Sequence, residues 1–87
     1  MVTLKDGREV DLELFKFNTC PFCVRVLTAI KTLGVEGIRM RDTRQEAGAE
    51  ADLIARGGKR QVPCLFIDGK PMYESGDIVN WLQANVG

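Results

Sequence analysis

Two cysteines, Cys20 and Cys23, stand two residues apart where an apolar run gives way to a helical pattern. Pro21 suits the first turn of a helix, because its missing N–H would have no partner there. The pattern therefore places Cys20 at a helix N-terminus, where free backbone N–H groups and the helix dipole favour an anion. We expect Cys20 to be a reactive thiolate that makes, attacks and exchanges disulfides.

Composition narrows the chemistry that these thiols can perform. The 87 residues suit one domain, in which we expect residues 1–10 to form a hairpin arm and residues 11–87 the core. The chain has no histidine, which excludes Ser-His-Asp catalysis, Cys-His catalysis and Cys/His zinc sites. Its 3 cysteines are an odd number, which does not make a disulfide framework and favours redox or metal chemistry in a reducing compartment.

Charge and hydropathy limit the expected partners and location. The 12 basic residues balance 12 acidic ones, whereas nucleic acid and anionic membranes call for a basic face. The sequence has no apolar stretch near about 18 residues and no signal-peptide pattern at its N-terminus. We therefore expect a cytoplasmic protein that binds neither nucleic acid nor membrane.

Turn signals and apolar periodicity define the elements that must position the cysteines. Asp6-Gly7 and Asp68-Gly69 are hairpin signals, and Pro71 marks the last strand as an edge strand. The predicted elements are strands at 2–5, 8–17 (most apolar over 12–17), 38–40, 64–67 and 70–73, and helices at 21–33, 45–56 and from residue 75 onward.

These elements follow the order β-α-β-α-β-β-α after the N-terminal arm. The first helix supplies the crossover that a parallel β-α-β unit requires, so we predict an α/β fold with a four-stranded mixed sheet flanked by three helices. Gly34 is expected to end the first helix, and Ser75 to cap the last one. Cys23 lies near the apolar stripe of the first helix and should be less exposed than Cys20.

The chain resembles a glutaredoxin, of the thioredoxin-fold superfamily, in three places that occur in the family's order. The first is Cys20-Pro21-Phe22-Cys23 between strand and helix, where the commonest family motif has Tyr instead of Phe22. The second is Val62-Pro63, where the family has Thr-Val-Pro with a cis proline. The third is the turn that leads into the last helix. The resemblance covers residues 11 to about 84 and implies a thioredoxin-like (glutaredoxin) fold.

The resemblance implies that Cys20 is the nucleophile, which forms a mixed disulfide, and that Cys23 is the resolving thiol, which closes a Cys20–Cys23 disulfide. Phe22 is then expected to line the active site and cover the thiol. The competing interpretation is half of a zinc or iron–sulfur site, but such sites need about four ligands. One chain offers 3 cysteines, so we predict no metal site within it. An iron–sulfur cluster that is bridged between two subunits and completed by glutathione stays open as an alternative.

Two segments resemble the glutathione sites of this superfamily. In thioredoxin-like folds the residue before the cis proline, here Val62, offers its N–H and C=O to the substrate backbone like an added strand. Glu74-Ser75 is similar to the Glu-Ser pair of glutathione transferase N-terminal domains, in which the Ser hydroxyl and a helix N-terminus hold the γ-glutamyl carboxylate. Glu74 or Asp77 would pair with the α-ammonium group. The alternatives are that Ser75 is a plain N-cap and that Asp77 compensates the helix dipole.

The glycyl carboxylate of glutathione requires cations on the opposite side of the site. Lys59 and Arg60 are our candidates, followed by Gln61 at a position where many glutaredoxins have Thr. Many glutaredoxins also carry a lysine three residues before the nucleophile, but that position is Phe17 here. Lys16 lies one residue away, and a shift of one residue along a strand turns a side chain to the other face.

We predict a glutathione-dependent thiol–disulfide oxidoreductase that reduces protein disulfides and protein–glutathione mixed disulfides, and so carries out electron transport between thiols. Glutathione is the expected co-substrate, no cofactor is expected to be tightly bound, and the protein is expected to be a monomer. Two alternatives stay open: a glutaredoxin-like reductase recharged by thioredoxin reductase, and an iron–sulfur cluster carrier. Cys64 is expected to be a small buried hydrophobe, with a redox role as the alternative.

Overall fold

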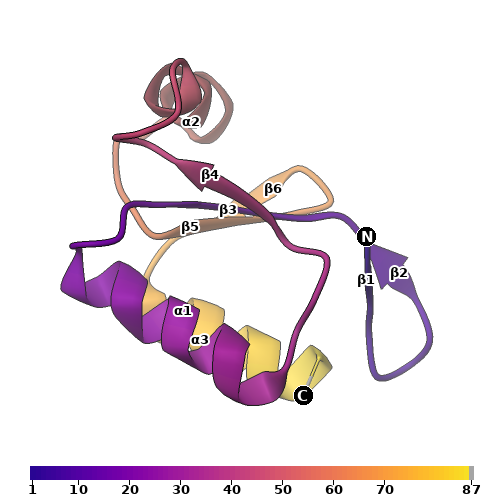
Figure 1. Ribbon diagram of the computed structural model, residues 1–87. Helices are drawn as coiled ribbons and strands as arrows, with labels where there is room; N and C mark the ends of the chain where they lie inside the picture. Colours follow the sequence, from indigo (N-terminus) through magenta and orange to yellow (C-terminus); the bar gives the residue numbers. More distant parts are fainter. Residues whose placement is uncertain (87) are drawn as a thin grey trace.

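Four strands form the central sheet of the computed structural model, which describes residues 1–86 (Figure 1). In chain order they are β3 (Leu12–Lys16), β4 (Arg39–Asp42), β5 (Cys64–Ile67) and β6 (Lys70–Met72). The sheet order is β4-β3-β5-β6, and β3 runs parallel to β4 and antiparallel to β5. The predicted mixed sheet is confirmed, and Pro71 lies on the edge strand β6 as expected.

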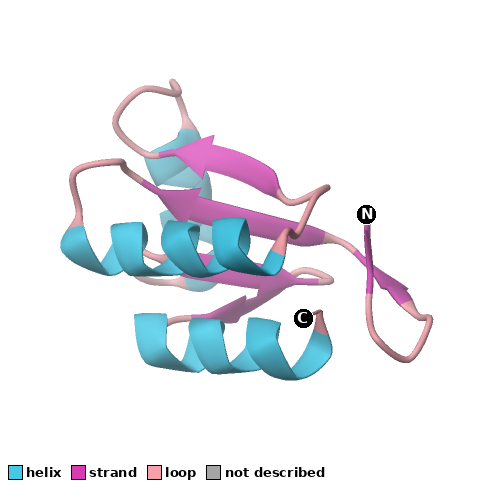
Figure 2. Ribbon diagram, turned by 60° about the horizontal axis from the view of Figure 1, so that its bottom comes forward, coloured by secondary structure: helices cyan, strands magenta, loops and turns pink. Residues whose placement is uncertain are grey.

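Within the described residues, three helices cover the two faces of this sheet: α1 (Pro21–Leu33), α2 (Ala49–Gly57) and α3 (Ser75–Asn85). Figures 1 and 2 show α1 and α3 side by side on one face and α2 on the other. The α1 helix buries Cys23, Val26 and Ile30, which recur at helical spacing. It ends at Gly34, whose φ of 70° is left-handed, as the sequence predicted.

The apolar core has one layer on each face of the sheet, because side chains alternate along a strand. Leu12, Leu14 and Leu65 face α1 and α3. Phe15 and Phe66 face α2, where they meet edge to face with ring centroids 5.3 Å apart. Burying one such side chain contributes about 1.5–3 kcal/mol to the free energy of unfolding. Both layers therefore help to hold the carboxyl ends of β3 and β4 in place.

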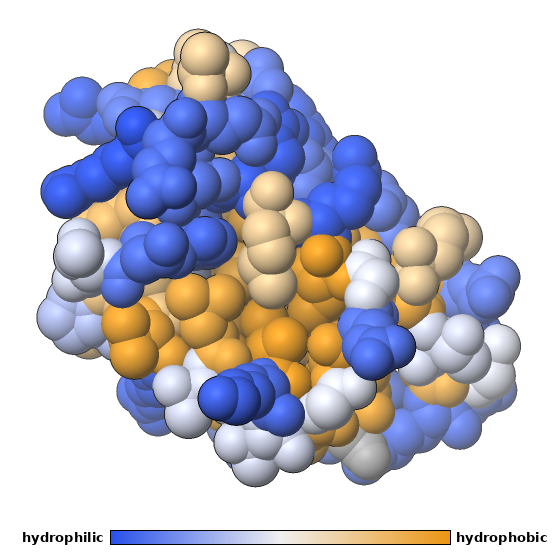
Figure 3. Space-filling view, viewed as in Figure 1, coloured by the Kyte–Doolittle hydropathy of each residue, from blue (hydrophilic) through white to orange (hydrophobic). Residues whose placement is uncertain are grey.

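A buried carboxylate, Glu13, interrupts the apolar face beneath α2. Its side chain is 1% exposed and is held by three guanidinium groups. The distances are 2.7 Å from Arg41 Nη1, 2.9 Å from Arg56 Nη1 and 3.2 Å from Arg39 Nη2. Burial opposes ionisation of Glu13, but the hydrogen bonds from Arg41 and Arg56 outweigh it and lower the pKa. Figure 3 shows hydrophilic residues gathered on the α2 side of the molecule and apolar residues below them.

The N-terminal arm is a hairpin of β1 (Val2–Thr3) and β2 (Glu9–Val10), joined through the predicted Asp6-Gly7 turn. The predicted hairpin arm is confirmed and forms a sheet of its own, so the second apolar run, residues 8–17, is divided between β2 and β3. Asp11 separates β2 from β3, and its N–H donates to Asp68 Oδ1 at 2.7 Å. The arm also holds the end of α3, because the Lys5 N–H donates to the Asn85 carbonyl at 2.7 Å.

Other predicted boundaries move by a few residues. The strand expected at 38–40 is β4, residues 39–42, and the helix expected at 45–56 is α2, residues 49–57. The Asp42 carboxylate accepts hydrogen bonds from the N–H groups of Arg44 and Gln45, which makes a turn where the helix was expected to start. The strand expected over 2–5 covers 2–3, and the strand expected to reach residue 73 ends at 72.

Two further points concern the ends of the chain and its helices. Gly87, the last residue of the predicted domain, lies outside the described residues. Among residues 1–86, every helix is too short or too polar to cross a membrane.

Candidate active site

Cys20 sits at the N-terminus of α1, where β3 and the loop after it deliver the thiol. It is the N-cap residue of α1, with φ −79° and ψ 121°, and its carbonyl accepts the Val24 N–H at 2.9 Å. The first turn of α1 contains no acidic residue, so nothing in that turn offsets the positive end of the helix dipole. Cys20 is half-buried and Cys23 is fully buried, so the predicted difference in exposure is confirmed.

The buried thiol of Cys23 lies within hydrogen-bonding reach of Cys20. Burial raises the pKa of Cys23 to about 11, and the hydrogen bond with Cys20 raises it as well. A hydrogen bond with the Phe17 backbone and the charge of Lys16 act in the opposite direction. At neutral pH Cys23 therefore keeps its proton beside the more accessible Cys20, as a resolving thiol would before the first exchange step.

Six of the predicted site residues surround one cavity of about 310 Å³. They come from the start of α1, the loop before β5 and the start of α3: Phe22, Gln61, Val62, Pro63, Glu74 and Ser75. The Phe22 side chain is 63% exposed, so it forms an open wall of this cavity. The fold thus brings together predicted site residues that lie up to 53 residues apart in the sequence.

The backbone of Val62 borders this cavity. The Val62–Pro63 peptide bond is cis, as the resemblance implied. Among residues 1–86, neither the N–H nor the C=O of Val62 has a hydrogen-bond partner. Both groups can therefore pair with the backbone of an extended ligand.

The start of α3 differs from the predicted capping. The N-cap residue is Glu74, with φ 66°, and Ser75 is the first residue of the helix, so the expectation that Ser75 is the cap is wrong. The first helical bond runs from the Ile78 N–H to the Glu74 carbonyl at 3.1 Å. The three N–H groups before it, including that of Asp77, are available to an anion. Asp77 itself is exposed and does not line the cavity.

Of the two predicted cations, Arg60 lines a second cavity together with Val62, whereas Lys59 lines neither cavity. The Lys59 ammonium lies 5.2 Å from the centre of the Tyr73 ring. Arg60 Nη1 lies 3.3 Å from Glu50 Oε1, and the Lys16 ammonium is paired with Asp42 at 3.4 Å.

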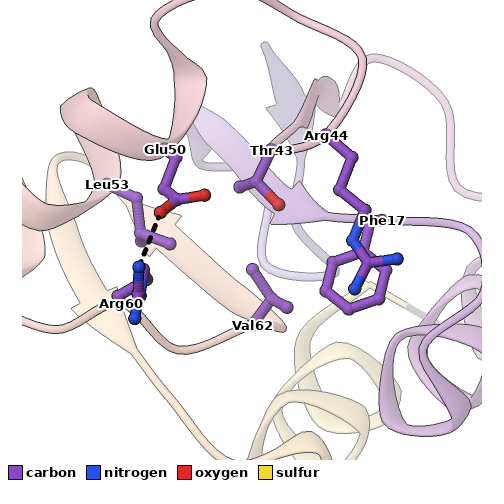
Figure 4. A pocket seen from close by; sticks show the side chains of 7 residues that line it. All are labelled: Phe17, Thr43, Arg44, Glu50, Leu53, Arg60 and Val62. Atoms are coloured by element: carbon purple, nitrogen blue, oxygen red, sulfur yellow. Dashed lines mark hydrogen bonds and ion pairs between the residues drawn. The ribbon is translucent and has the colours of Figure 1, made fainter.

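A second cavity of about 240 Å³ adjoins the first and shares Val62 with it. Figure 4 shows Arg60 facing Glu50 on one side and Arg44 lying over the Phe17 ring on the other. The Arg44 guanidinium carbon is 3.9 Å from the ring centre. Thr43 and Leu53 complete the lining.

Sequence reasoning missed Arg44 as a site residue, although a signal was present. Phe17 comes directly after β3, Arg44 comes two residues after the end of β4, and these strands are parallel. The carboxyl ends of neighbouring parallel strands lie at the same edge of a sheet, so the two side chains had to be close.

Cys64 lies in the apolar layer beneath α2, with Phe15 opposite it in the strand register. It is fully buried, as expected of a small hydrophobe, and burial raises the pKa of its thiol to about 11. In the described part of the chain, no group of three or more Cys, Asp or Glu side chains is arranged to hold a metal ion.

Fold and site together define a thiol–disulfide oxidoreductase of thioredoxin-like fold. A family model described as Glutaredoxin matches residues 12–72, and the chain belongs to the glutaredoxin family. It is 34% identical over 67 residues to the probable glutaredoxin ssr2061 of Synechocystis sp., which covers 77% of this chain and 76% of the relative. A second probable glutaredoxin of Synechocystis sp., slr1562, is 29% identical over 63 residues, covering 72% of this chain and 58% of the relative.

Solved structures agree with this assignment. A wheat glutaredoxin superimposes with a TM-score of 0.64 at 28% identity, over 84% of this chain and 70% of that one. A glutathione transferase homologue from Sulfitobacter, solved with bound glutathione, gives a TM-score of 0.70 at 22% identity, over 87% of this chain. This chain spans 37% of that transferase, and at this identity the likeness shows the fold.

Proposed function

We propose that the protein is a glutathione-dependent oxidoreductase that reduces protein disulfides and protein–glutathione mixed disulfides. The observation that carries the proposal is the cavity beside the Cys20 loop. It presents the unpaired backbone of Val62 and the N-terminus of α3 to a ligand. Such a surface suits a short peptide that has an extended backbone and a carboxylate at one end.

The proposed reaction begins at Cys20. Its thiolate attacks the glutathione sulfur of a protein–glutathione disulfide, which forms a bond from Cys20 to glutathione and releases the protein thiolate, which takes up a proton. A glutathione thiolate then attacks that sulfur, giving oxidised glutathione and restoring the Cys20 thiolate. With a protein disulfide, Cys23 loses its proton and attacks the mixed disulfide instead. The protein is then left with a Cys20–Cys23 disulfide, which two glutathione molecules reduce.

We assign the parts of glutathione to residues as follows. The γ-glutamyl carboxylate binds the free N–H groups of α3 and the Ser75 hydroxyl, and the α-ammonium pairs with Glu74 or Asp77. The cysteinyl backbone pairs with Val62, between the walls formed by Phe22, Gln61 and Pro63. The glycyl carboxylate lies toward Lys59 and Arg60. This orientation is supported by Glu74 in the first cavity and by Arg60, which is paired with Glu50, in the second.

We further propose that the protein acts as a monomer in the cytoplasm, on disulfide or glutathionylated proteins. The odd number of cysteines in the sequence, 3, argues against a structural disulfide framework and supports a reducing compartment. Size-exclusion chromatography of the reduced protein, with and without glutathione, tests the monomer.

The deciding experiment is steady-state reduction of the glutathione–cysteamine mixed disulfide with glutathione and glutathione reductase, run beside an assay with thioredoxin reductase. Turnover with the glutathione couple is the expected result. Turnover only with thioredoxin reductase would still support exchange at Cys20, but it would contradict the assignment of the site residues to glutathione. A coloured dimer formed on anaerobic addition of iron and sulfide would instead support the cluster carrier.

A further inference from the structure

One hydrogen bond joins two walls of the first cavity that belong to different elements. Gln61 Nε2, in the loop before β5, donates to Glu74 Oε1, at the start of α3, over a distance of 3.4 Å. Both residues line the cavity of about 310 Å³. Gln61 is half-buried, whereas Glu74 is exposed. The less exposed amide therefore restricts a carboxylate that would otherwise move freely in solvent.

The Glu74 side chain does not cap the helix that it precedes. Glu74 is the N-cap residue of α3, yet its side chain makes no hydrogen bond to the first turn. At many N-caps a side-chain oxygen folds back onto the free N–H groups and occupies them. Because Glu74 leaves them unoccupied, the N–H groups of α3 stay available to an anion from a ligand.

Two opposite poles therefore lie side by side at this end of the cavity. The N-terminus of α3 and the hydroxyl of Ser75, a residue that is 8% exposed and lines the cavity, form a pole that suits a carboxylate. The Glu74 carboxylate forms a pole that suits an ammonium group. An α-amino acid carries both groups on one carbon atom, so the two poles together fit the free α-amino acid end of a peptide.

Gln61 can keep these two poles apart. The dipole of α3 attracts the Glu74 carboxylate, and a carboxylate that moved onto the N–H groups would fill the anion pole and withdraw from the cavity. The hydrogen bond from Gln61 opposes this movement. Gln61 is also a neutral partner, so Glu74 keeps its negative charge, whereas Glu50 is paired with the cation Arg60. A charge held in place before the ligand arrives also lowers the entropy cost of binding.

We propose that Gln61 is a positioning residue that acts through Glu74. Its amide holds the Glu74 carboxylate toward the α-ammonium group of a γ-glutamyl substrate and away from the N-terminus of α3. The proposal rests on the proposed function, which places the γ-glutamyl end of glutathione at α3. It narrows the substrate class to thiol peptides that carry a free α-amino group and a free α-carboxylate at one end.

The test compares glutathione, γ-Glu-Cys-Gly, with two analogues that each lack one charged group. Glutaryl-Cys-Gly lacks the α-amino group, and γ-aminobutyryl-Cys-Gly lacks the α-carboxylate. Each peptide is supplied as a mixed disulfide with thionitrobenzoate to a protein that carries Cys23→Ser. The Cys20 thiolate attacks the peptide sulfur, a Cys20–peptide disulfide forms, and thionitrobenzoate leaves as a coloured thiolate, so no reductant is needed. The second-order rate constant is measured at low salt.

We expect glutathione to react about fivefold faster than the glutaryl peptide, the size that a partly exposed ion pair supports. Gln61→Met, which keeps a side chain of similar length without the amide, should lower this ratio to about two. It should also lower the ratio of glutathione to the γ-aminobutyryl peptide, because the released Glu74 carboxylate then competes for the N-terminus of α3.

Two further variants show whether Gln61 acts through Glu74. Glu74→Ala should bring the ratio of glutathione to the glutaryl peptide to about one, and adding Gln61→Met to it should change neither ratio further. Gln83→Met, the same substitution at an exposed glutamine near the other end of α3, is the matched control and should keep both ratios.

Three outcomes would overturn the proposal. A ratio of glutathione to glutaryl peptide that stays the same in Gln61→Met would show that the amide does not position Glu74, even if all three peptides react more slowly. A ratio that rises in Gln61→Met would show that Gln61 competes with the ammonium group for Glu74. A ratio that survives Glu74→Ala would show that another residue pairs with the ammonium group.

The proposed function is judged separately, by comparing γ-Glu-Cys-Gly with the cysteamine disulfide of the same leaving group. If those two react equally fast in the Cys23→Ser protein, glutathione recognition fails, and the role of Gln61 fails with it. If glutathione reacts faster than cysteamine but its ratio to the glutaryl peptide ignores Gln61→Met, the role of Gln61 fails alone.

Discussion

The Cys23 thiol is buried at the start of α1 beside the half-buried Cys20, and its burial, with Cys20 next to it, raises its pKa to about 11. Cys20 occupies the N-cap position at the positive end of the α1 dipole, whereas Cys23 sits inside the first turn with no access to solvent. A substrate disulfide can therefore reach one sulfur and not the other. This asymmetry in exposure supports the proposed roles, in which Cys20 attacks and Cys23 resolves.

Single serine substitutions test that division. Cys20→Ser should lower exchange activity to background with every disulfide substrate, because the accessible nucleophile is lost. Cys23→Ser should retain deglutathionylation within about tenfold, because a second glutathione resolves that intermediate. The same variant should lose most of its activity on protein disulfides. Steady-state assays with both substrate types measure this, and substantial activity in Cys20→Ser would show that another thiol attacks.

The raised pKa of Cys23 predicts a pH dependence for the internal step. The thiolate attacks, and its fraction grows about tenfold per pH unit while the pH stays below the pKa of about 11. The rate at which Cys23 expels a bound thiol from Cys20 should therefore rise with pH from 7 to 9. Stopped-flow measurement on a preformed mixed disulfide, without free glutathione, gives this rate. A profile that is flat above pH 7 would mean that burial does not hold the proton on Cys23.

Local patterns in the sequence were sufficient for the elements on which the reactive cysteine depends. The hairpin turns, the extent of α1 and its end at Gly34 follow from short-range periodicity and turn chemistry, and all are confirmed. The cis peptide at Pro63 came from the resemblance. These features depend on residues close together in the chain, which is why the sequence predicts them.

The features that sequence reasoning missed depend on residues far apart in the chain. The sequence shows Glu13 as a single charge within an apolar strand, and its partners Arg39, Arg41 and Arg56 come from two other elements. Arg44 reaches the site because β4 ends beside β3, which required the sheet order to be known. Elements that pair across the fold thus decide both the buried charge and the second cavity.

The Glu13 cluster predicts a stability effect that is separate from the active site. Glu13→Gln leaves three guanidinium groups around a neutral side chain, and breaking such a buried pair typically costs about 3–5 kcal/mol. Arg39 and Arg56 reach solvent, so we expect about 2–3 kcal/mol of lost stability from this effect. Asp52→Asn, which removes an exposed partner of Arg41, should cost less than about 1 kcal/mol. Urea unfolding at pH 7 compares the free energies of unfolding of the two variants with that of the unsubstituted protein.

Acid pH provides a second readout for the same cluster. The folded pKa of Glu13 lies below its usual range, so its stabilising contribution is complete above the unfolded pKa of about 4.3 and is lost as the pH falls through the lower folded value. Between pH 5 and 3 the native sequence should lose more stability than Glu13→Gln. Parallel slopes for the two proteins would show that folding does not lower the pKa of Glu13.

Glu74 combines an unfavourable backbone conformation with a carboxylate at the proposed glutathione site, and two substitutions separate these properties. Its φ of 66° is a region that costs a non-glycine residue about 1–3 kcal/mol, and Gln61 Nε2 donates to its Oε1 at 3.4 Å. Glu74→Gly removes both the conformational cost and the carboxylate, whereas Glu74→Ala removes the carboxylate alone.

We expect Glu74→Gly to be about 1 kcal/mol more stable than Glu74→Ala, because glycine adopts a positive φ without steric cost. Both variants should raise KM for glutathione by a similar factor, because both lose the partner of the α-ammonium group. Urea unfolding and steady-state kinetics measure the two effects independently. Equal stability would mean that the backbone at position 74 is relaxed in the native protein. An unchanged KM in both variants would indicate that Asp77, and not Glu74, pairs with the α-ammonium group of glutathione. The variant Asp77→Asn then tests this in the same assay.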